Sequence, residues 1–180
     1  KSGLNEVEKA VNAADEARTL WSNIGLEERA DWLHKIADAL EARSDEIASL
    51  ESLDTGKPIA LARAVDASRS VANFRFFAQF AKEFTVEDFE MDDAMNHVIL
   101  KSVGIAGLIT PWNLPLYLLS WKIAPAIVMG NTVVAKPSEI TPMTAYLFSK
   151  ICKKAGLPDG VLNIVHGYGH KVGASMSKHP

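Results

Sequence analysis

The first ninety residues carry their apolar positions at helical spacing. In the segment 30–40, apolar residues recur at i, i+3, i+4 and i+7, the spacing of a helix that buries one face. Asn5, with Glu8 three residues on, predicts an N-terminal cap, and Gly56 followed by Pro58 predicts a helix end. The predicted helices lie near 5–17, 30–40, 45–53 and 60–84. The pattern therefore predicts a helical N-terminal part over residues 1–95.

The pattern changes after about residue 90. Residues 96–103 alternate loosely between β-branched or aliphatic and polar side chains, which predicts a strand. Strands and helices then alternate, and Thr141 before Pro142 predicts the start of one of these helices. The predicted strands are 105–110, 131–136 and 161–165, and the predicted helices are 115–129, 141–155 and 169–178. This order predicts an α/β fold in which 104–180 form a parallel βαβαβ half sheet.

Composition excludes several classes of protein. The 180 residues are 48% hydrophobic and 23% charged, with a formal net charge of −3, so neither disorder nor nucleic-acid binding is expected. The longest apolar run, 114–129, is interrupted by Lys122 and Pro125, and no membrane span is predicted. The five histidines show no metal-ligand spacing, so no metal is expected. The single cysteine, Cys152, is typical of a reducing compartment, and we expect a cytoplasmic protein.

Three polar or glycine-rich signals follow the three strands of the predicted parallel sheet. They are Pro111-Trp-Asn113, Lys136-Pro-Ser-Glu139 and Gly167-Tyr-Gly-His-Lys-Val-Gly173. Ligands of a doubly wound sheet bind beyond the carboxyl ends of its strands, where all three signals are expected. Lys136 precedes a proline, so it should project from an extended strand end. With Glu139 it could hydrogen-bond ribose hydroxyls, or it could form an ordinary exposed pair, and the glycines could simply make a tight turn.

Asn113 has two interpretations from spacing alone. Asparagine is a preferred residue at helix N-caps, and a helix is expected just after it. Alternatively, its amide could donate a hydrogen bond to an oxygen that becomes negative during a reaction, an interaction worth about 3–4 kcal/mol in the transition state.

The three signals, in this order, resemble the cofactor half of an aldehyde dehydrogenase. The resemblance covers essentially the whole chain and includes Asp54-Thr-Gly-Lys-Pro58 and Trp121-Lys-Ile-Ala-Pro-Ala126. It implies an aldehyde dehydrogenase-like α/β fold, with 96–103 as a strand of an oligomerisation ribbon and 104–180 as an incomplete Rossmann-type half sheet. The implied cofactor is NAD rather than NADP, because the Glu139 carboxylate would repel a 2′-phosphate. The implied cofactor contacts are Thr110, Pro111, Trp112, Lys136, Ser138, Glu139, Gly169 and Gly173.

The resemblance also implies catalytic and substrate positions. Asn113 would supply the oxyanion hole for a thiohemiacetal, and Lys122 would assist proton release near the general base. The tunnel for the aldehyde would be lined by Leu114, Tyr117, Leu118 and Trp121, whose spacing taken alone predicts a buried core stripe.

Within the family, two segments look most like the branch that oxidises 2-aminomuconic and 2-hydroxymuconic semialdehydes. They are Asn73-Phe-Arg-Phe-Phe77 and Trp112-Asn-Leu-Pro-Leu-Tyr117. These substrates carry carboxylates, and Arg69 aligns with a carboxylate-binding arginine of that branch; a guanidinium can bind a carboxylate with two hydrogen bonds. An exposed helix arginine without this role is an equal alternative. Betaine-aldehyde and retinal oxidation are the alternative substrate branches.

The family's catalytic cysteine, general-base glutamate and catalytic domain would all lie beyond Pro180. The 180 residues alone are therefore expected to have no dehydrogenase activity, and to belong to a longer homo-oligomeric enzyme. Cys152 lies in a predicted helix away from any activating group and is expected to be structural. The alternative is a truncated, non-catalytic protein that retains only nucleotide binding or subunit contacts.

Overall fold

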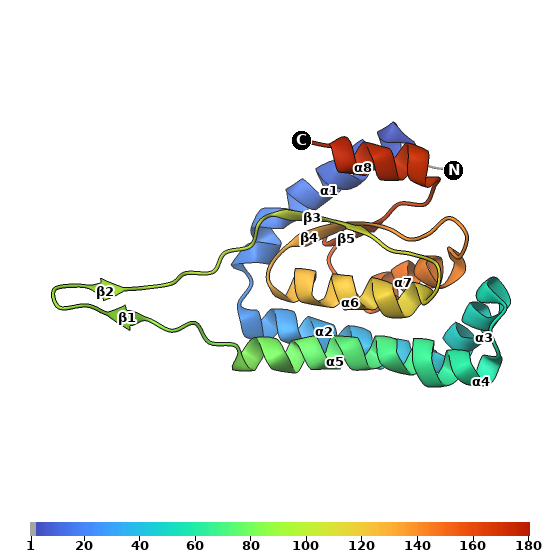
Figure 1. Ribbon diagram of the computed structural model, residues 1–180, viewed down its shortest axis with the longest axis horizontal. Helices are drawn as coiled ribbons and strands as arrows, with labels where there is room; N and C mark the ends of the chain where they lie inside the picture. Colours follow the sequence, from blue (N-terminus) through green and yellow to red (C-terminus); the bar gives the residue numbers. More distant parts are fainter. Residues whose placement is uncertain (1–2) are drawn as a thin grey trace.

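The protein is built around a parallel sheet with helices on both faces. The computed structural model describes residues 3–180, and within them this sheet has the order β3-β4-β5 (Figure 1). The strands are β3 (Ile105–Ile109), β4 (Thr132–Lys136) and β5 (Leu162–Ile164). Ile105 pairs with Thr132, and Val133 pairs with Leu162. All five residues of the central strand β4 are buried, as expected for a strand covered on both faces. The predicted α/β fold is confirmed.

The helices form one layer above the sheet and two below it (Figure 1). One face is covered by α1 (Leu4–Asn23), with η2 (Gly169–Gly173) and α8 (Ala174–Lys178) beside it. The other face carries α6 (Pro115–Val128) and α7 (Met143–Lys154), over which pack α2 (Leu26–Glu41) and α5 (Ser68–Glu83). The predicted stripe of α2 is fully buried against these neighbours; it consists of Ala30, Leu33, Ile36, Ala37 and Leu40. The remaining elements are α3 (Ser44–Thr55), α4 (Ile59–Leu61) and η1 (Ala62–Ala67).

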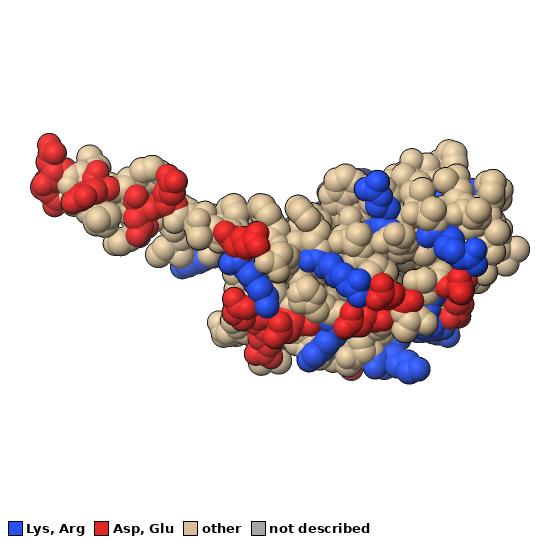
Figure 2. Space-filling model, turned by 90° about the horizontal axis from the view of Figure 1, so that it is seen from below, with Lys and Arg blue, Asp and Glu red and all other residues tan. Residues whose placement is uncertain are grey.

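A narrow arm projects from the layered body. It is an antiparallel hairpin of β1 (Phe89–Glu90) and β2 (Met95–Asn96). The strand predicted over 96–103 is wrong beyond Asn96, because within the described chain 97–103 pair with no neighbouring strand. Figure 2 shows carboxylates gathered along this arm. They belong to Glu87, Asp88, Glu90, Asp92 and Asp93.

Two predicted helix caps are replaced by others. At the start of α1 the backbone N–H of Gly3 donates to Glu6 Oε2 at 2.7 Å, so the cap predicted at Asn5 is wrong. The Thr141 hydroxyl has no hydrogen-bond partner among residues 3–180, and α7 is capped instead by Asp54, whose Oδ2 accepts from Met143 N at 2.9 Å. A carboxylate from a distant helix competes successfully for a free helix N–H, which sequence spacing cannot reveal.

Two predicted helices are less regular than their periodicity suggested. The helix expected over 60–84 contains the π-helical turn η1, which separates the short α4 from α5. The helix expected over 169–178 likewise opens with the π-helical η2 before α8. A π-helical turn adds a residue to the turn and rotates the residues around it, and it often occurs next to functional sites.

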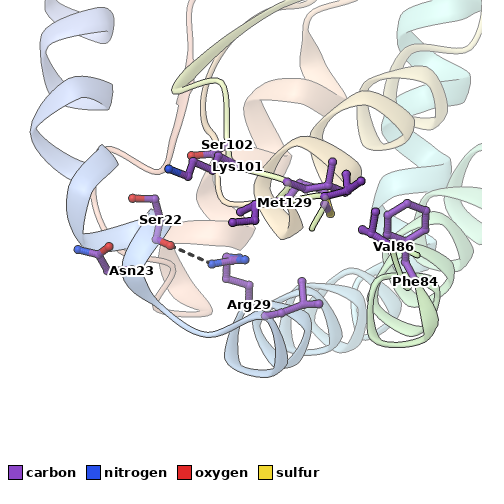
Figure 3. A pocket seen from close by; sticks show the side chains of 12 residues that line it. Ser22, Asn23, Arg29, Phe84, Val86, Lys101, Ser102 and Met129 are labelled. Atoms are coloured by element: carbon purple, nitrogen blue, oxygen red, sulfur yellow. Dashed lines mark hydrogen bonds between the residues drawn. The ribbon is translucent and has the colours of Figure 1, made fainter. Parts of the chain in front are cut away.

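A cavity of about 640 Å³ lies at the amino edge of the sheet, where the arm joins the body (Figure 3). Arg29 lies in its wall, and its Nε donates to the Val128 carbonyl at 2.7 Å. Its Nη1 donates to Ser22 O at 3.3 Å and also to Ile24 O. Arg29 therefore satisfies the last carbonyls of both α1 and α6, and partial burial lowers its pKa. This cavity is lined by structural side chains and lies at the sheet edge opposite to the predicted site.

Candidate functional site

The three sequence signals meet at the carboxyl edge of the sheet. The Thr110 N–H donates to Lys136 O at 3.1 Å, which extends the pairing of β3 and β4 and brings the first two signals together. The Gly169 N–H donates to Glu139 Oε1 at 3.0 Å, which joins the second signal to the third. Parallel strands place their carboxyl ends at one edge, so these contacts follow from the topology.

Lys136 and Glu139 form a partly buried ion pair. The Lys136 Nζ lies 2.9 Å from Glu139 Oε2 and donates to Pro137 O at 3.0 Å. Lys136 is only 2% exposed, so it turns back into the protein rather than projecting from the strand end as predicted. The pKa of Glu139 falls to about 2, chiefly because the Gly169 N–H and its own N–H bond to it, and also because of Lys136. The edge therefore presents a partly exposed carboxylate that is ionised at neutral pH.

A cavity of about 290 Å³ opens beside this carboxylate. It is lined by Glu139, Pro142, His166, Gly167 and Tyr168. The ring of Tyr168 stacks on the ring of His170, with the ring centroids 5.5 Å apart. Burial, together with the positive charge of Lys136, lowers the pKa of His166, which favours its neutral form. An apolar slot with a single fixed carboxylate suits an aromatic base joined to a sugar with free hydroxyls.

The glycines of the third signal play different parts. Gly169 supplies the N–H that holds Glu139. Gly173 is buried against the Lys136 side chain, where an added Cβ would lie 3.7 Å from Lys136 Cδ. That separation is an ordinary van der Waals contact. The structure thus connects both glycines to the Lys136–Glu139 pair. Ser138, also predicted, is 8% exposed, and its Oγ accepts from Ile140 N at 3.2 Å, which shapes the turn.

Asn113 is not a helix cap. Helix α6 has Leu114 at its N-cap position and no side-chain cap. Asn113 is exposed, and among residues 3–180 its side-chain amide has no hydrogen-bond partner, so the amide can donate to a ligand. Its main-chain oxygen accepts from Lys57 Nζ at 3.4 Å. Trp112 beside it is 57% exposed, and Thr110 just before is 4% exposed. The turn therefore presents Pro111, Trp112 and the Asn113 amide on its outer side.

The predicted tunnel residues line the outer side of α6. The rings of Tyr117 and Trp121 lie 5.5 Å apart, and Trp121 is 49% exposed. Leu114 and Leu118 are partly buried. The interpretation of these four as a core stripe is wrong, because the buried face of α6 is formed by other residues. That face consists of Leu116, Leu119, Ile123 and Ile127.

Arg69 lies on α5 near this outer face. One turn further along the same helix, Asn73 Nδ2 donates to Tyr117 O at 3.2 Å and to Ser120 Oγ at 2.9 Å. Residues four apart share a helix face, so Arg69 is on the side of α5 that meets α6. Arg69 is exposed and makes no ion pair with the described residues. Lys122 on α6 is exposed as well, and its Nζ donates to Ile109 O at 2.7 Å, so its charge is not buried.

Comparison with known proteins identifies the family of the chain. The model of the aldehyde dehydrogenase family matches residues 1–180. This chain belongs to the aldehyde dehydrogenase family. It is 52% identical to human 2-aminomuconic semialdehyde dehydrogenase, with 99% of this chain aligned to 37% of that protein. It is 45% identical to 2-hydroxymuconic semialdehyde dehydrogenase of Pseudomonas sp. (strain CF600), with 100% of this chain aligned to 38% of that protein. The chain thus spans a little over a third of the length of these relatives.

Solved structures of two similar proteins share the fold. The crystal structure of PnpE in complex with nicotinamide adenine dinucleotide matches with a TM-score of 0.94 at 42% identity. The match covers 98% of this chain and 37% of that chain. HpcC of Thermus thermophilus matches with a TM-score of 0.96 at 40% identity, over 100% of this chain and 35% of that chain.

The structure adds a buried ionic cluster that sequence reasoning did not assign. Glu51 on α3 and Asp66 on η1 are both fully buried, and Lys57 pairs with Asp66 at 2.7 Å. The motif Asp54-Thr-Gly-Lys-Pro58 was recognised in the sequence as a family signature, but without a role for its lysine. The only available signal was that motif, because Asp66 and Asn113 approach Lys57 through the tertiary fold.

Cys152 has the environment of a structural thiol. It is 3% exposed, and burial raises its pKa well above the usual range, so it is held as the unreactive thiol. Among residues 3–180, no group of three or more His, Cys, Asp or Glu side chains is arranged to hold a metal ion. No helix in that part of the chain is long and apolar enough to cross a membrane.

Proposed function

We propose that this chain is the cofactor-binding and oxyanion-donating segment of an NAD-dependent aldehyde dehydrogenase that converts an aldehyde to its carboxylic acid. The observation that carries the proposal is the meeting of three turns at one sheet edge. One turn offers the side-chain amide of Asn113, which has no hydrogen-bond partner among residues 3–180, and the other two hold the charged carboxylate of Glu139.

The residues at this edge fit the adenosine half of NAD. Glu139 remains ionised because its pKa is about 2, and a fixed carboxylate accepts hydrogen bonds from ribose hydroxyls. The same charge repels a 2′-phosphate, which favours NAD over NADP. The cavity beside it, lined in part by His166 and Tyr168, suits the adenine ring. When bound, NAD supplies the hydride acceptor, while these residues bind and orient it.

Asn113 provides the chemical contribution of the chain. Its side-chain amide can donate to the aldehyde oxygen as that oxygen becomes negative, which is typically worth about 3–4 kcal/mol. The exposed side of α6, with Tyr117 and Trp121, would guide the aldehyde toward it. Cys152 cannot be the nucleophile because it is buried with a raised pKa. The attacking thiolate and the general base would have to come from another part of the protein.

The substrate class follows from Arg69 and the relatives. Arg69 is an exposed guanidinium on the α5 face that meets α6, with no carboxylate partner among the described residues. It could bind a substrate carboxylate through two hydrogen bonds. Relatives named for muconic semialdehydes, whose substrates carry carboxylates, support such a substrate here. Betaine aldehyde and retinal remain the alternative substrates.

The arm is the proposed subunit-contact element. Phe76, Phe80 and Phe84 follow one side of α5 toward it, and each is 46% exposed or more. Phe76 and Phe80 stack with ring centroids 5.7 Å apart. An exposed apolar stripe beside a protruding hairpin favours burial against another subunit, so we propose a homo-oligomer. The proposed division is 1–95 for the helical part, 96–103 for the ribbon and 104–180 for the half sheet.

The test is aldehyde-dependent NADH formation by the intact protein from its source, after its mass has been measured. With 2-hydroxymuconic semialdehyde as substrate, Asn113→Ala is expected to lower kcat by about 10²–10³-fold. The affinity for NAD is expected to be unchanged, because the amide acts on the aldehyde. Asn12→Ala, at an exposed asparagine of α1, is the matched control and should retain full activity.

Two results would refute this function. One is an Asn113→Ala variant with the kcat of the unaltered protein. The other is an intact mass of 19.6 kDa, which would leave the protein without an accessible thiolate. In that case NAD binding without turnover would identify the alternative, a non-catalytic nucleotide-binding protein.

A further inference from the structure

Lys57 occupies an unusual position between a buried carboxylate and the turn that carries Asn113. Its Nζ lies 2.7 Å from Asp66 Oδ2, and it also donates to the main-chain oxygen of Asn113 at 3.4 Å. The Lys57 side chain is 12% exposed and the Asp66 side chain is fully buried. An ammonium in such a place orients strongly toward its few partners, because it has little water to replace them.

The backbone around Lys57 is held on both sides. The Ser52 hydroxyl donates to Lys57 O at 2.7 Å, and the Lys57 N–H donates to Thr55 Oγ1 at 3.3 Å. Gly56 between them has φ +76°, the left-handed conformation that lets the chain turn sharply after α3. These hydrogen bonds therefore hold the backbone from Ser52 to Lys57 in the conformation that places the Lys57 ammonium next to the Asn113 turn.

Asp66, the carboxylate partner of Lys57, is also held in place. Asp66 lies in the π-helical turn η1, and the Ser70 hydroxyl donates to its main-chain oxygen at 2.6 Å. Its second carboxylate oxygen has no hydrogen-bond partner among residues 3–180. Glu51 approaches from α3, and burial, then the nearby Asp66 charge, raises its pKa to about 7 against the opposing effects of Thr144 and Lys57. The raised pKa of Glu51 favours its neutral form, and in that form Lys57 and Asp66 remain as a charge-balanced pair.

We propose that Lys57, held by Asp66, is a positioning residue that fixes the turn carrying the oxyanion donor Asn113. The proposal rests on the proposed function, because it takes the Asn113 amide as that donor. Lys57 touches neither aldehyde nor NAD. It binds the carbonyl oxygen of the Asn113–Leu114 peptide. This contact limits rotation of that peptide, and so it limits movement of the adjoining Cα atom that carries the amide side chain.

The position of the amide governs the rate because a hydrogen-bond donor must meet the oxygen where its charge develops. A misplacement of about 1 Å can lower a rate by about 10²-fold. Without the ammonium, the Asn113 carbonyl loses the contact that links it through Lys57 to Asp66 on η1. The exposed turn then gains conformational freedom. A purely structural ion pair would instead stabilise the fold without any dependence on the Asn113 side chain.

The test is a double-mutant cycle in the intact protein, with NAD and 2-hydroxymuconic semialdehyde as the probes. Lys57→Met is made alone and together with Asn113→Ala, and kcat, both KM values and the melting temperature are measured. Lys57→Met is expected to lower kcat about tenfold or more in the native background and less than about twofold in the Asn113→Ala background. The KM for NAD is expected to stay unchanged. Lys35→Met is the matched control, because Lys35 lies over the Trp32 ring on α2, away from the sheet edge.

A second variant separates function from folding. Lys57→Met alone leaves Asp66 as an unpaired buried charge, whereas Lys57→Met with Asp66→Asn removes both charges. The double replacement is expected to fold and to show the same loss of kcat. Equal effects of Lys57→Met in both backgrounds, or unfolding of both variants, would overturn the positioning role. If Asn113→Ala impairs kcat and Lys57→Met does not, only this inference fails; if Asn113→Ala has no effect, the proposed function fails first.

Discussion

Gly160 is expected to be the glycine least tolerant of a side chain, because α1 crosses its backbone at very short range. It lies between α7 and β5 with φ +86°, and an added Cβ would lie 2.3 Å from Ala13 O and 2.8 Å from Ala17 Cβ. Both atoms belong to α1, one to its backbone, so a rotamer change cannot relieve the contact. Gly160→Ala would force α1 away from the sheet it covers.

The magnitude has two parts. The left-handed conformation costs an alanine about 1–2 kcal/mol, and overpacking adds about 1–3 kcal/mol. We therefore expect Gly160→Ala to lower the free energy of unfolding by about 2–5 kcal/mol. Gly156→Ala is the matched control, because Gly156 has a similar φ of +84° but its nearest neighbour, Trp32 Cη2, would be 3.8 Å from the new Cβ. Only the conformational cost of about 1–2 kcal/mol should appear there.

The assay is amide hydrogen exchange of the intact protein, combined with urea unfolding. Gly160→Ala should lower protection along α1, from about Val7 to Trp21, and shift the urea midpoint downward. Gly156→Ala should leave the α1 amides protected. Equal destabilisation by the two variants, or undisturbed α1 exchange in Gly160→Ala, would refute the argument from close approach.

Four further outcomes are expected. Because the pKa of Glu51 is about 7 in the fold and 4.5 in the unperturbed state, the fold favours its protonated form; this stabilisation is complete below about pH 4.5 and is lost as the pH rises through 7. The free energy of unfolding of the native protein should therefore fall by about 3 kcal/mol between pH 4.5 and 8, and this fall should be absent in Glu51→Gln. The same pH dependence of urea unfolding in both proteins would contradict the assignment of this fall to Glu51. Glu139→Gln should raise the affinity for NADP relative to that for NAD, whereas the native protein should show no loss of NAD affinity from this group between pH 5 and 8, since its pKa is about 2; calorimetric titration with each nucleotide checks both statements. Arg69→Ala should raise KM about tenfold or more for a carboxylated semialdehyde and leave KM for hexanal unchanged, so equal changes for both aldehydes would exclude a carboxylate contact. Cys152 should resist alkylation by iodoacetamide in the folded protein and react once urea unfolds it, and rapid labelling of the native state would show that the thiol is accessible.

Much of the fold could be predicted because its signals are local. The apolar spacing of α2, the glycine stop after α3 and the alternation of strands and helices after residue 104 all describe neighbours along the chain. The strand over 96–103 failed for the opposite reason. A strand needs a partner for its backbone groups, and alternation in the sequence does not say whether one is present.

The candidate site likewise has features that the sequence predicted and features that depend on tertiary contacts. The order of Pro-Trp-Asn, Lys-Pro-Ser-Glu and the spaced glycines determined which residues meet at the sheet edge, because a parallel sheet collects its strand ends there. The tertiary structure alone decided how those residues are held. Lys136 turns inward because Glu139 and Pro137 O offer its ammonium partners. Leu114 occupies the N-cap position of α6, so the Asn113 amide is not used as a helix cap and has no partner within the described chain.

The sequence by itself determined the family pattern, the period of each helix and the chemical groups available at the strand ends. Only the tertiary structure decided that Lys57 and Asp66 meet beneath the Asn113 turn and that the buried Glu51 lies beside them. Lys57 lies in the turn after α3 and Asp66 in η1, so no helical periodicity in the sequence connects the two charges. Their pairing depends on α3, η1 and α6 being packed together, and that packing is set by apolar surfaces rather than by the charges themselves.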